Sequence, residues 1–205
     1  YIRFYFIKSF YYCIHMFAFK KKYYLIIQSI KDIDLKNIKL VDKFTVIYRN
    51  NTRIDNLIDL GRFRQECRRR RIDFFVANNP LLLIKLKADG LYISSHNKNL
   101  NLAKFKNHNF EIIGSAHNIN EINIKNKQGC SHIIFSRLFK TTYSFKKDFL
   151  GVVRFNLLKS IRNNSFIPLG GIRLNNLNKL KMVNSIAFAV LSEVKKKPAI
   201  ISRLF

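Results

Sequence analysis

The chain has 205 residues, of which 38 are lysine or arginine and 12 are aspartate or glutamate, so its formal net charge is +26. This length suits one domain or two small ones, and a hydrophobic content of 48% excludes a wholly disordered chain. Cys13, Cys67 and Cys130 are far apart and form no CxxC pair, which argues against a disulfide framework and a cysteine zinc site. We therefore expect reduced thiols and a cytoplasmic protein.

The strong positive charge does not by itself predict a nucleic-acid-binding protein. Asn, Lys, Ile and Phe are abundant along the whole chain, which is the composition expected of an AT-rich genome. The best basic patch lies on one predicted helix and contains Arg62, Arg64 and the arginine run at 68–71. A solvated helix face is the simpler interpretation of such a run. We expect no specific nucleic-acid partner, and RNA binding stays a remote alternative.

Residues 1–19 are rich in aromatic residues and contain no acidic residue, but they do not form a good membrane span. Arg3, Lys8 and His15 interrupt the apolar run, which is then shorter than the roughly 20 residues that a span needs. The stretch also lacks the small-residue cleavage site of a signal peptide. We expect an N-terminal tail over residues 1–19, a natural start at Met16, one domain over residues 20–205, and no membrane partner.

From residue 23 onward, short apolar runs alternate with longer amphipathic or polar stretches. The runs are almost continuously hydrophobic, which is typical of parallel strands that are buried on both faces. The eight predicted strands cover residues 23–27, 44–48, 74–77, 90–93, 111–114, 132–135, 166–169 and 186–191.

The stretches between these strands predict helices. They cover residues 54–71, 119–129, 152–161 and 174–183, with a weaker helix at 81–86 and a nearly all-polar link at 97–110. Asn118 is a predicted N-cap and Gly129 a predicted C-cap. The alternation favours a compact α/β fold, the (β/α)8 TIM barrel, and a doubly wound open sheet is the alternative that periodicity leaves open. In both folds, active residues follow the carboxyl ends of strands.

Three strand ends carry residues suited to a phosphate. Gly170 and Gly171 follow the seventh strand and Ser192 follows the eighth. Adjacent glycines let the backbone approach a ligand closely, and the loops after strands seven and eight often bind phosphate in barrels. Arg49, at the end of the second strand, can clamp a phosphate through two hydrogen bonds. We therefore predict an anion site at this end of the barrel.

Other strand ends bear on acid–base and metal chemistry. His117 follows the fifth strand and could transfer protons near neutral pH, although a histidine there could also be a loop filler or helix cap. The third strand ends at Asn79 and the fourth runs into residues 94–97, with no carboxylate at either end. A Mg²⁺ site normally has one or two carboxylates, so no metal ligand is predicted.

Four short stretches near these strands, taken in order, resemble the thiamine phosphate synthase family and its close relatives, the thiazole tautomerases. The stretches are residues 88–93 (ADGLYI), 114–118 (GSAHN), 132–136 (HIIFS) and 169–172 (LGGI), and the resemblance covers residues 23–194. It implies a (β/α)8 barrel and a place in thiamine biosynthesis. The synthases join a pyrimidine diphosphate to a thiazole phosphate and release pyrophosphate with the help of Mg²⁺, so both phosphorylated ligands are implied partners.

The family's functional positions carry over to this chain unevenly. The residues that match substrate-binding positions are Arg49, Ser115, Thr141, Gly170, Gly171 and Ser192. The family's two acidic metal positions fall on Asn79 and Asn97. Loss of two carboxylates from a site for a hard cation should weaken Mg²⁺ binding severely.

The resemblance leaves three functions open. The chain is a divergent synthase that couples both substrates and uses Mg²⁺, or a tautomerase-like enzyme that uses His117 without a metal, or a phosphate-ligand binder that does not catalyse. His117 matches the histidine that shuttles protons in the tautomerases, and the synthases often carry a histidine at this position as well, so the match does not distinguish the two reactions. We expect a thiamine-pathway protein that binds a thiazole phosphate after strands seven and eight. The sequence leaves its oligomeric state open, a homo-oligomer included.

Overall fold

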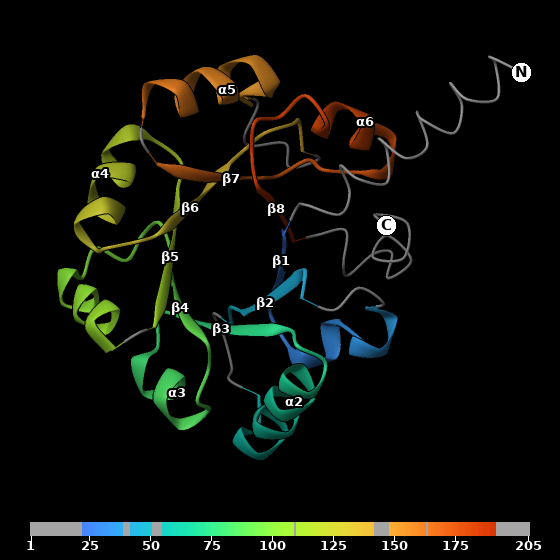
Figure 1. The fold of residues 1–205 in the computed structure, drawn as a ribbon, viewed down its shortest axis with the longest axis vertical. Helices are drawn as coiled ribbons and strands as arrows, with labels where there is room; N and C mark the ends of the chain where they lie inside the picture. The colour runs from blue at the N-terminus through green and yellow to red at the C-terminus, as the bar shows by residue number, and fades with distance from the viewer. Residues whose placement is uncertain are drawn as a thin grey trace, which may run out of the picture.

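The computed structural model describes residues 22–38, 42–50, 55–108, 110–141, 148–162 and 164–191. The expected N-terminal tail, the start at Met16, and Ser192 lie outside these residues. The described part contains eight strands in a closed barrel (Figure 1). They are β1 (Lys22–Ile27), β2 (Phe44–Tyr48), β3 (Asp73–Ala77), β4 (Gly90–Ile93), β5 (Glu111–Ala116), β6 (His132–Ser136), β7 (Ser165–Leu169) and β8 (Ala187–Val190).

All eight predicted strands are confirmed, and the open-sheet alternative is excluded. Every strand pairs in parallel with its sequence neighbours, and β1 closes the ring against β8 with Tyr23 opposite Phe188. Because no strand is left as an edge in a closed ring, each strand forms hydrogen bonds on both sides. The carboxyl ends of all eight strands therefore meet at one mouth of the barrel.

Helices and short 3₁₀ turns surround the ring (Figure 1). The α-helices are α2 (Leu57–Arg69), α3 (Pro80–Lys85), α4 (Ile119–Lys127), α5 (Gly151–Ile161) and α6 (Leu177–Leu180). The 3₁₀ helices are η1 (Ile30–Asp32), η2 (Leu35–Asn37), η3 (Leu100–His108) and η4 (Leu174–Asn176). The predicted caps are confirmed: Asn118 accepts a hydrogen bond from the Glu121 N–H, and Gly129 has a φ of +73° just after α4.

Two predicted links differ from the structure. The helix expected over residues 174–183 is only the short pair η4 and α6, because Asn176 turns its side chain back to the Gly171 carbonyl at 2.7 Å. The nearly all-polar link at 97–110, for which the sequence predicts no helix, contains the 3₁₀ helix η3. Leu102 and Phe105 are buried and three residues apart, which matches the three-residue turn of a 3₁₀ helix.

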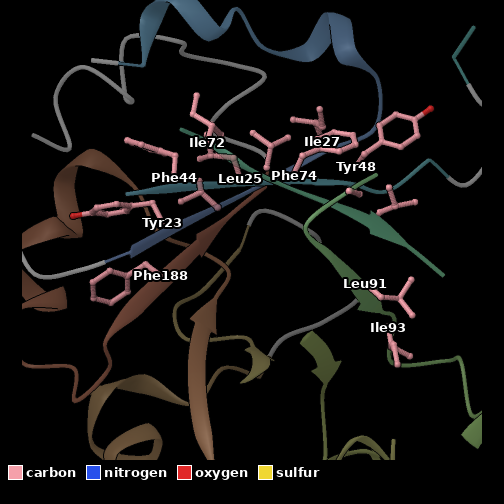
Figure 2. Close-up of a cluster of buried hydrophobic side chains, with 14 of the residues drawn as sticks. Tyr23, Leu25, Ile27, Phe44, Tyr48, Ile72, Phe74, Leu91, Ile93 and Phe188 are labelled. Atoms are coloured by element: carbon pink, nitrogen blue, oxygen red, sulfur yellow. The ribbon is translucent and has the colours of Figure 1, made fainter. Parts of the chain in front are cut away.

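Alternation along the strands builds two hydrophobic layers. The interior layer consists of strand residues: Tyr24, Ile26, Ile47, Phe75, Tyr92, Ile113, Ile134, Ile167, Ala187 and Ala189. The outer layer joins the other strand faces to the helices, and Figure 2 shows part of it on β1 to β4, with Tyr23, Leu25, Phe44 and Phe74 among its members. Burial on both faces is the physical reason why these strands appear as continuous apolar runs in the sequence.

Candidate functional site

The candidate site lies at the mouth formed by the carboxyl ends of the strands. Ser115 and Ser136 are each two positions beyond an interior residue of their strand, Ile113 and Ile134. Side chains alternate along a strand, so both hydroxyls face the mouth of the barrel. Leu169 of β7 packs against the same interior layer. The mouth therefore has a floor of small hydroxyls beside apolar side chains.

A histidine and a serine from neighbouring strand ends are in direct contact. Strand pairing places Ala116 opposite Phe135, and one residue further on the Ser136 Oγ lies 2.7 Å from the His117 Nδ1. The backbone N–H of His117 donates to the Glu121 Oε2 at 2.7 Å, which anchors the histidine at the start of α4. The His117 side chain is exposed at the mouth. A hydroxyl and an imidazole at this distance can exchange a proton.

Ser136 was missing from the predicted site residues. It is 19 residues from His117 in the sequence, and each of the two residues is unremarkable there. The signal that could have found Ser136 is the register of a closed parallel ring, in which the end of β6 lies beside the end of β5.

The glycine turn after β7 approaches the loop after β6 closely. Gly170 and Gly171 have φ values of +99° and +67°, which side chains other than glycine rarely adopt. Hydrogen bonds pin the two loops together: the Phe139 N–H donates to the Gly170 carbonyl at 3.0 Å, and the Leu138 N–H donates to the Leu169 carbonyl at 2.9 Å. The positive φ values explain why glycines stand at this turn, and the use of the turn by a ligand stays a prediction.

An arginine and a threonine lie beside this turn. The Arg137 Nη1 donates to the Thr141 Oγ1 at 3.0 Å, and a Cβ on Gly170 would lie 3.1 Å from the Arg137 Cγ. Thr141 is one of the predicted substrate-binding residues, and Arg137 is not. A guanidinium, a hydroxyl and a glycine turn together form a surface suited to a phosphate or carboxylate.

Arg49 is separated from these residues. It follows β2, which is four strands away from β6 in the ring, so it lies across the mouth from Ser136. Its backbone N–H donates to the Ile27 carbonyl at 2.8 Å, which extends the pairing of β1 with β2. The structure thus gathers His117, Ser115, Thr141 and the glycines on one half of the mouth and places Arg49 on the other.

The ends of β3 and β4 form an amide-rich edge. The Asn78 Oδ1 accepts hydrogen bonds from the Ser94 N–H at 3.0 Å and from the Asn97 Nδ2 at 3.2 Å. The Asn79 Oδ1 is used as the N-cap of α3, where it accepts from the Leu82 N–H at 3.0 Å. Within the described ranges, no group of three His, Cys, Asp or Glu side chains could hold a metal ion. We define residues 78 and 79 with 94–97 as the amide edge.

The arginines of α2 are largely paired with carboxylates. The Arg64 Nη2 lies 2.7 Å from the Asp89 Oδ1, and Arg69 and Arg70 both contact Glu66. Arg71 lies 3.8 Å from Asp42. Such pairs reduce the free positive charge of this helix, and the absence of a specific nucleic-acid partner stays a prediction. No helix in the described part of the chain is long and apolar enough to cross a membrane.

The amino-acid sequence is similar to known thiamine-phosphate synthases. Residues 40–194 match a family model described as thiamine monophosphate synthase. The thiamine-phosphate synthase of Pelagibacter ubique is 27% identical over 160 residues, which are 75% of this chain and 74% of that protein. A thiamine-phosphate synthase of Prochlorococcus marinus is 25% identical over 170 residues, which are 82% of this chain but only 48% of that protein.

The fold is also that of solved structures. Thiamine phosphate pyrophosphorylase from Pyrococcus furiosus superimposes with a TM-score of 0.65 and 17% identity, over 92% of this chain and 99% of that one. At 17% identity, this similarity establishes the shared fold alone.

Proposed function

The chain belongs to the thiamine monophosphate synthase family, and on that premise we propose that it binds a phosphorylated thiazole at the ends of β5 to β8. The phosphate would lie on the Gly170–Gly171 turn beside Arg137 and Thr141. The thiazole ring would lie over the floor made by Ser115, close to His117. Ser192, which follows β8, would complete the phosphate site, as would be expected of a barrel of this kind.

The reaction that this geometry supports best is proton transfer on the bound thiazole, as in a tautomerase. The observation that carries this proposal is the 2.7 Å contact between the His117 Nδ1 and the Ser136 Oγ. A tautomerisation moves one proton between two positions of the same molecule. A neutral imidazole can accept a proton from one position of the thiazole and return it to another, and the hydrogen bond with Ser136 orients the His117 ring.

Coupling of the thiazole to a pyrimidine diphosphate is the second candidate, because the relatives named above are synthases. That reaction uses Mg²⁺ in the family, and the residues present do not fit this ion. The two acidic positions are Asn79 and Asn97, and the Asn79 oxygen already caps α3. Neutral amides that are engaged in hydrogen bonds are poor ligands for a hard cation. The residues of the amide edge therefore do not fit a Mg²⁺ ion that would take part in the reaction.

One experiment separates the two reactions. Purified protein is incubated with a thiazole carboxylate phosphate in D2O and EDTA, and deuterium incorporation and isomer ratio are followed by NMR. We expect turnover that falls at least about a hundredfold in His117→Gln and about tenfold in Ser136→Ala. His96→Gln, an exposed histidine at the amide edge, is the matched control and should keep wild-type turnover.

Pyrophosphate release from both synthase substrates is measured in parallel, with Mg²⁺ and with EDTA. Coupling that depends on Mg²⁺, together with no isomer turnover in EDTA, would overturn the proton-transfer proposal and favour the synthase reaction. No detectable binding of the thiazole phosphate would overturn both.

The phosphate half of the proposal has its own test. Arg137→Met should weaken binding of the thiazole phosphate about tenfold or more, because a charge-assisted hydrogen bond to the phosphate is lost. Titration calorimetry measures this change, with Arg154→Met on α5 as the control at an exposed arginine. Equal affinity of both variants would show that the anion does not lie beside Arg137.

A further inference from the structure

A buried lysine lies behind the amide edge. Lys125 is on α4 and has no exposed surface, and its Nζ donates to the Ser94 carbonyl at 2.7 Å, the Asn97 carbonyl at 2.8 Å and the Gln128 Oε1 at 2.8 Å. An ammonium group has three N–H donors, so all three are satisfied. Burial lowers the pKa of Lys125 from 10.5 to about 8, so the group is still mainly charged at neutral pH.

Gln128, about one helical turn after Lys125, also forms hydrogen bonds with the loop after β4. It also has no exposed surface, and its Nε2 donates to the carbonyls of Asn97 and Asn99 at 3.0 Å each. The two side chains together hold three carbonyls between residues 94 and 99. The β4 loop is thus attached to α4, although 28 to 31 residues separate the partners along the chain.

Packing alone does not account for a lysine at this position. A buried ammonium costs desolvation that an aliphatic side chain of the same length would avoid. Gly114 makes room for the side chain, because a Cβ there would lie 2.7 Å from the Lys125 Cδ. The Lys125 side chain fits the space that Gly114 leaves. Compared with an aliphatic residue, the lysine adds hydrogen bonds from its Nζ to the carbonyls of the loop.

The loop held in this way carries the amide edge. The Asn97 Nδ2 and the Ser94 N–H both donate to the Asn78 Oδ1, so the β4 loop is joined to the turn after β3. A divalent cation can join two loops by taking oxygen ligands from each. In this chain, hydrogen bonds of amide side chains join the two loops. The Lys125 ammonium donates to three oxygens from the side of α4.

We propose that Lys125 is a positioning residue whose buried ammonium, with Gln128, fixes the β4 loop and keeps the amide edge ordered without a divalent cation. The inference does not depend on which reaction the protein catalyses. Its test measures the order of the β4 loop. The proposal for Lys125 can therefore fail while the proposed function holds, and the proposed function can fail while the proposal for Lys125 holds.

The test is amide hydrogen exchange measured by mass spectrometry on the full chain. In Lys125→Met, which keeps the length and loses the charge, exchange at residues 94–99 should rise at least about tenfold while β6 and β7 keep their protection. Lys127→Met, an exposed lysine on the same helix, should leave the loop unchanged. Wild-type exchange at 94–99 should be the same in millimolar Mg²⁺ and in EDTA.

Two results would overturn the proposal. One is unchanged exchange at 94–99 in Lys125→Met, and the other is wild-type loop protection that rises with Mg²⁺. If circular dichroism shows that Lys125→Met does not fold, Gln128→Leu carries the test. It removes the two Nε2 hydrogen bonds and one Nζ acceptor but keeps the ammonium, and it should raise exchange at 97–99 by a smaller factor.

Discussion

Gly171 lies so close to Phe139 that a Cβ on the glycine would be 2.5 Å from the Phe139 carbonyl oxygen. The residues belong to the loops after β7 and β6, and neither loop can move away freely because backbone hydrogen bonds join them. The neighbouring carbonyl of Lys140 would be 2.7 Å from the same Cβ. The turn is therefore constrained twice, by its positive φ and by the backbone it faces.

Gly171→Ala should separate these two loops. We expect a loss of about 2 kcal/mol or more in the free energy of unfolding, since left-handed alanine costs about 1 kcal/mol and the carbonyl contact adds to it. Binding of the phosphorylated thiazole should weaken in the same variant. Chemical denaturation and calorimetry measure the two effects.

Two other glycines supply the controls for that variant. Gly151 has a φ of +72° with open space around its Cβ position, so Gly151→Ala reports the backbone strain without the contact. Gly61 lies in α2 with open space, so Gly61→Ala should leave the protein equally stable or up to about 1 kcal/mol more stable. A Gly171→Ala variant no worse than Gly151→Ala would show that the loop contact imposes no constraint.

Arg64 is the arginine of α2 with a structural role. It is almost buried, and it donates to the Asp89 Oδ1 at 2.7 Å and to the Lys87 carbonyl at 3.2 Å. Arg64→Leu should cost about 2 kcal/mol of unfolding free energy, because it leaves the carboxylate and the carbonyl without that donor. Arg62→Leu should change stability by less than about 0.5 kcal/mol, since Arg62 is exposed and 3.5 Å from Asp59. Similar midpoints for both variants in urea would contradict this difference.

His132, at the amino end of β6, should make the stability of the fold depend on pH. Burial lowers the pKa of His132 from its usual 6.5, an effect that the nearby Glu111 opposes, and its Nδ1 has no hydrogen-bond partner among the described residues. The unfolded chain takes up this proton near pH 6.5, whereas the folded chain resists it to lower pH. Stability is therefore present above pH 6.5 and decreases as the pH falls below that value.

Urea midpoints at pH 7.5 and pH 5.5 measure this dependence. His132→Gln should show a smaller decrease between the two values than the wild type. His108→Gln, an exposed histidine at the end of η3, should keep the wild-type decrease. If His132→Gln keeps it as well, the acid sensitivity arises elsewhere.

The strands, most helices and the caps could be predicted from the sequence because local chemistry sets them. A run such as Phe44–Tyr48 is apolar except at Thr45, and Asn118 and Gly129 have the side chain and the backbone freedom that their caps require. The resemblance to the family also rested on short local stretches at strand ends. These features need only neighbours in sequence, so no knowledge of the tertiary structure is required to find them.

Closure of the ring agrees with the predicted (β/α)8 barrel, but local patterns left an open sheet possible and did not predict the contacts at the mouth. Periodicity is the same for an open sheet and for a barrel, and only the pairing of β1 with β8 distinguishes them. The contact between His117 and Ser136 depends on strand register, and the grip of Lys125 on the Ser94 carbonyl spans 31 residues. Such contacts form only when folding brings distant segments together, because the interactions that stabilise them have no local signal in the chain.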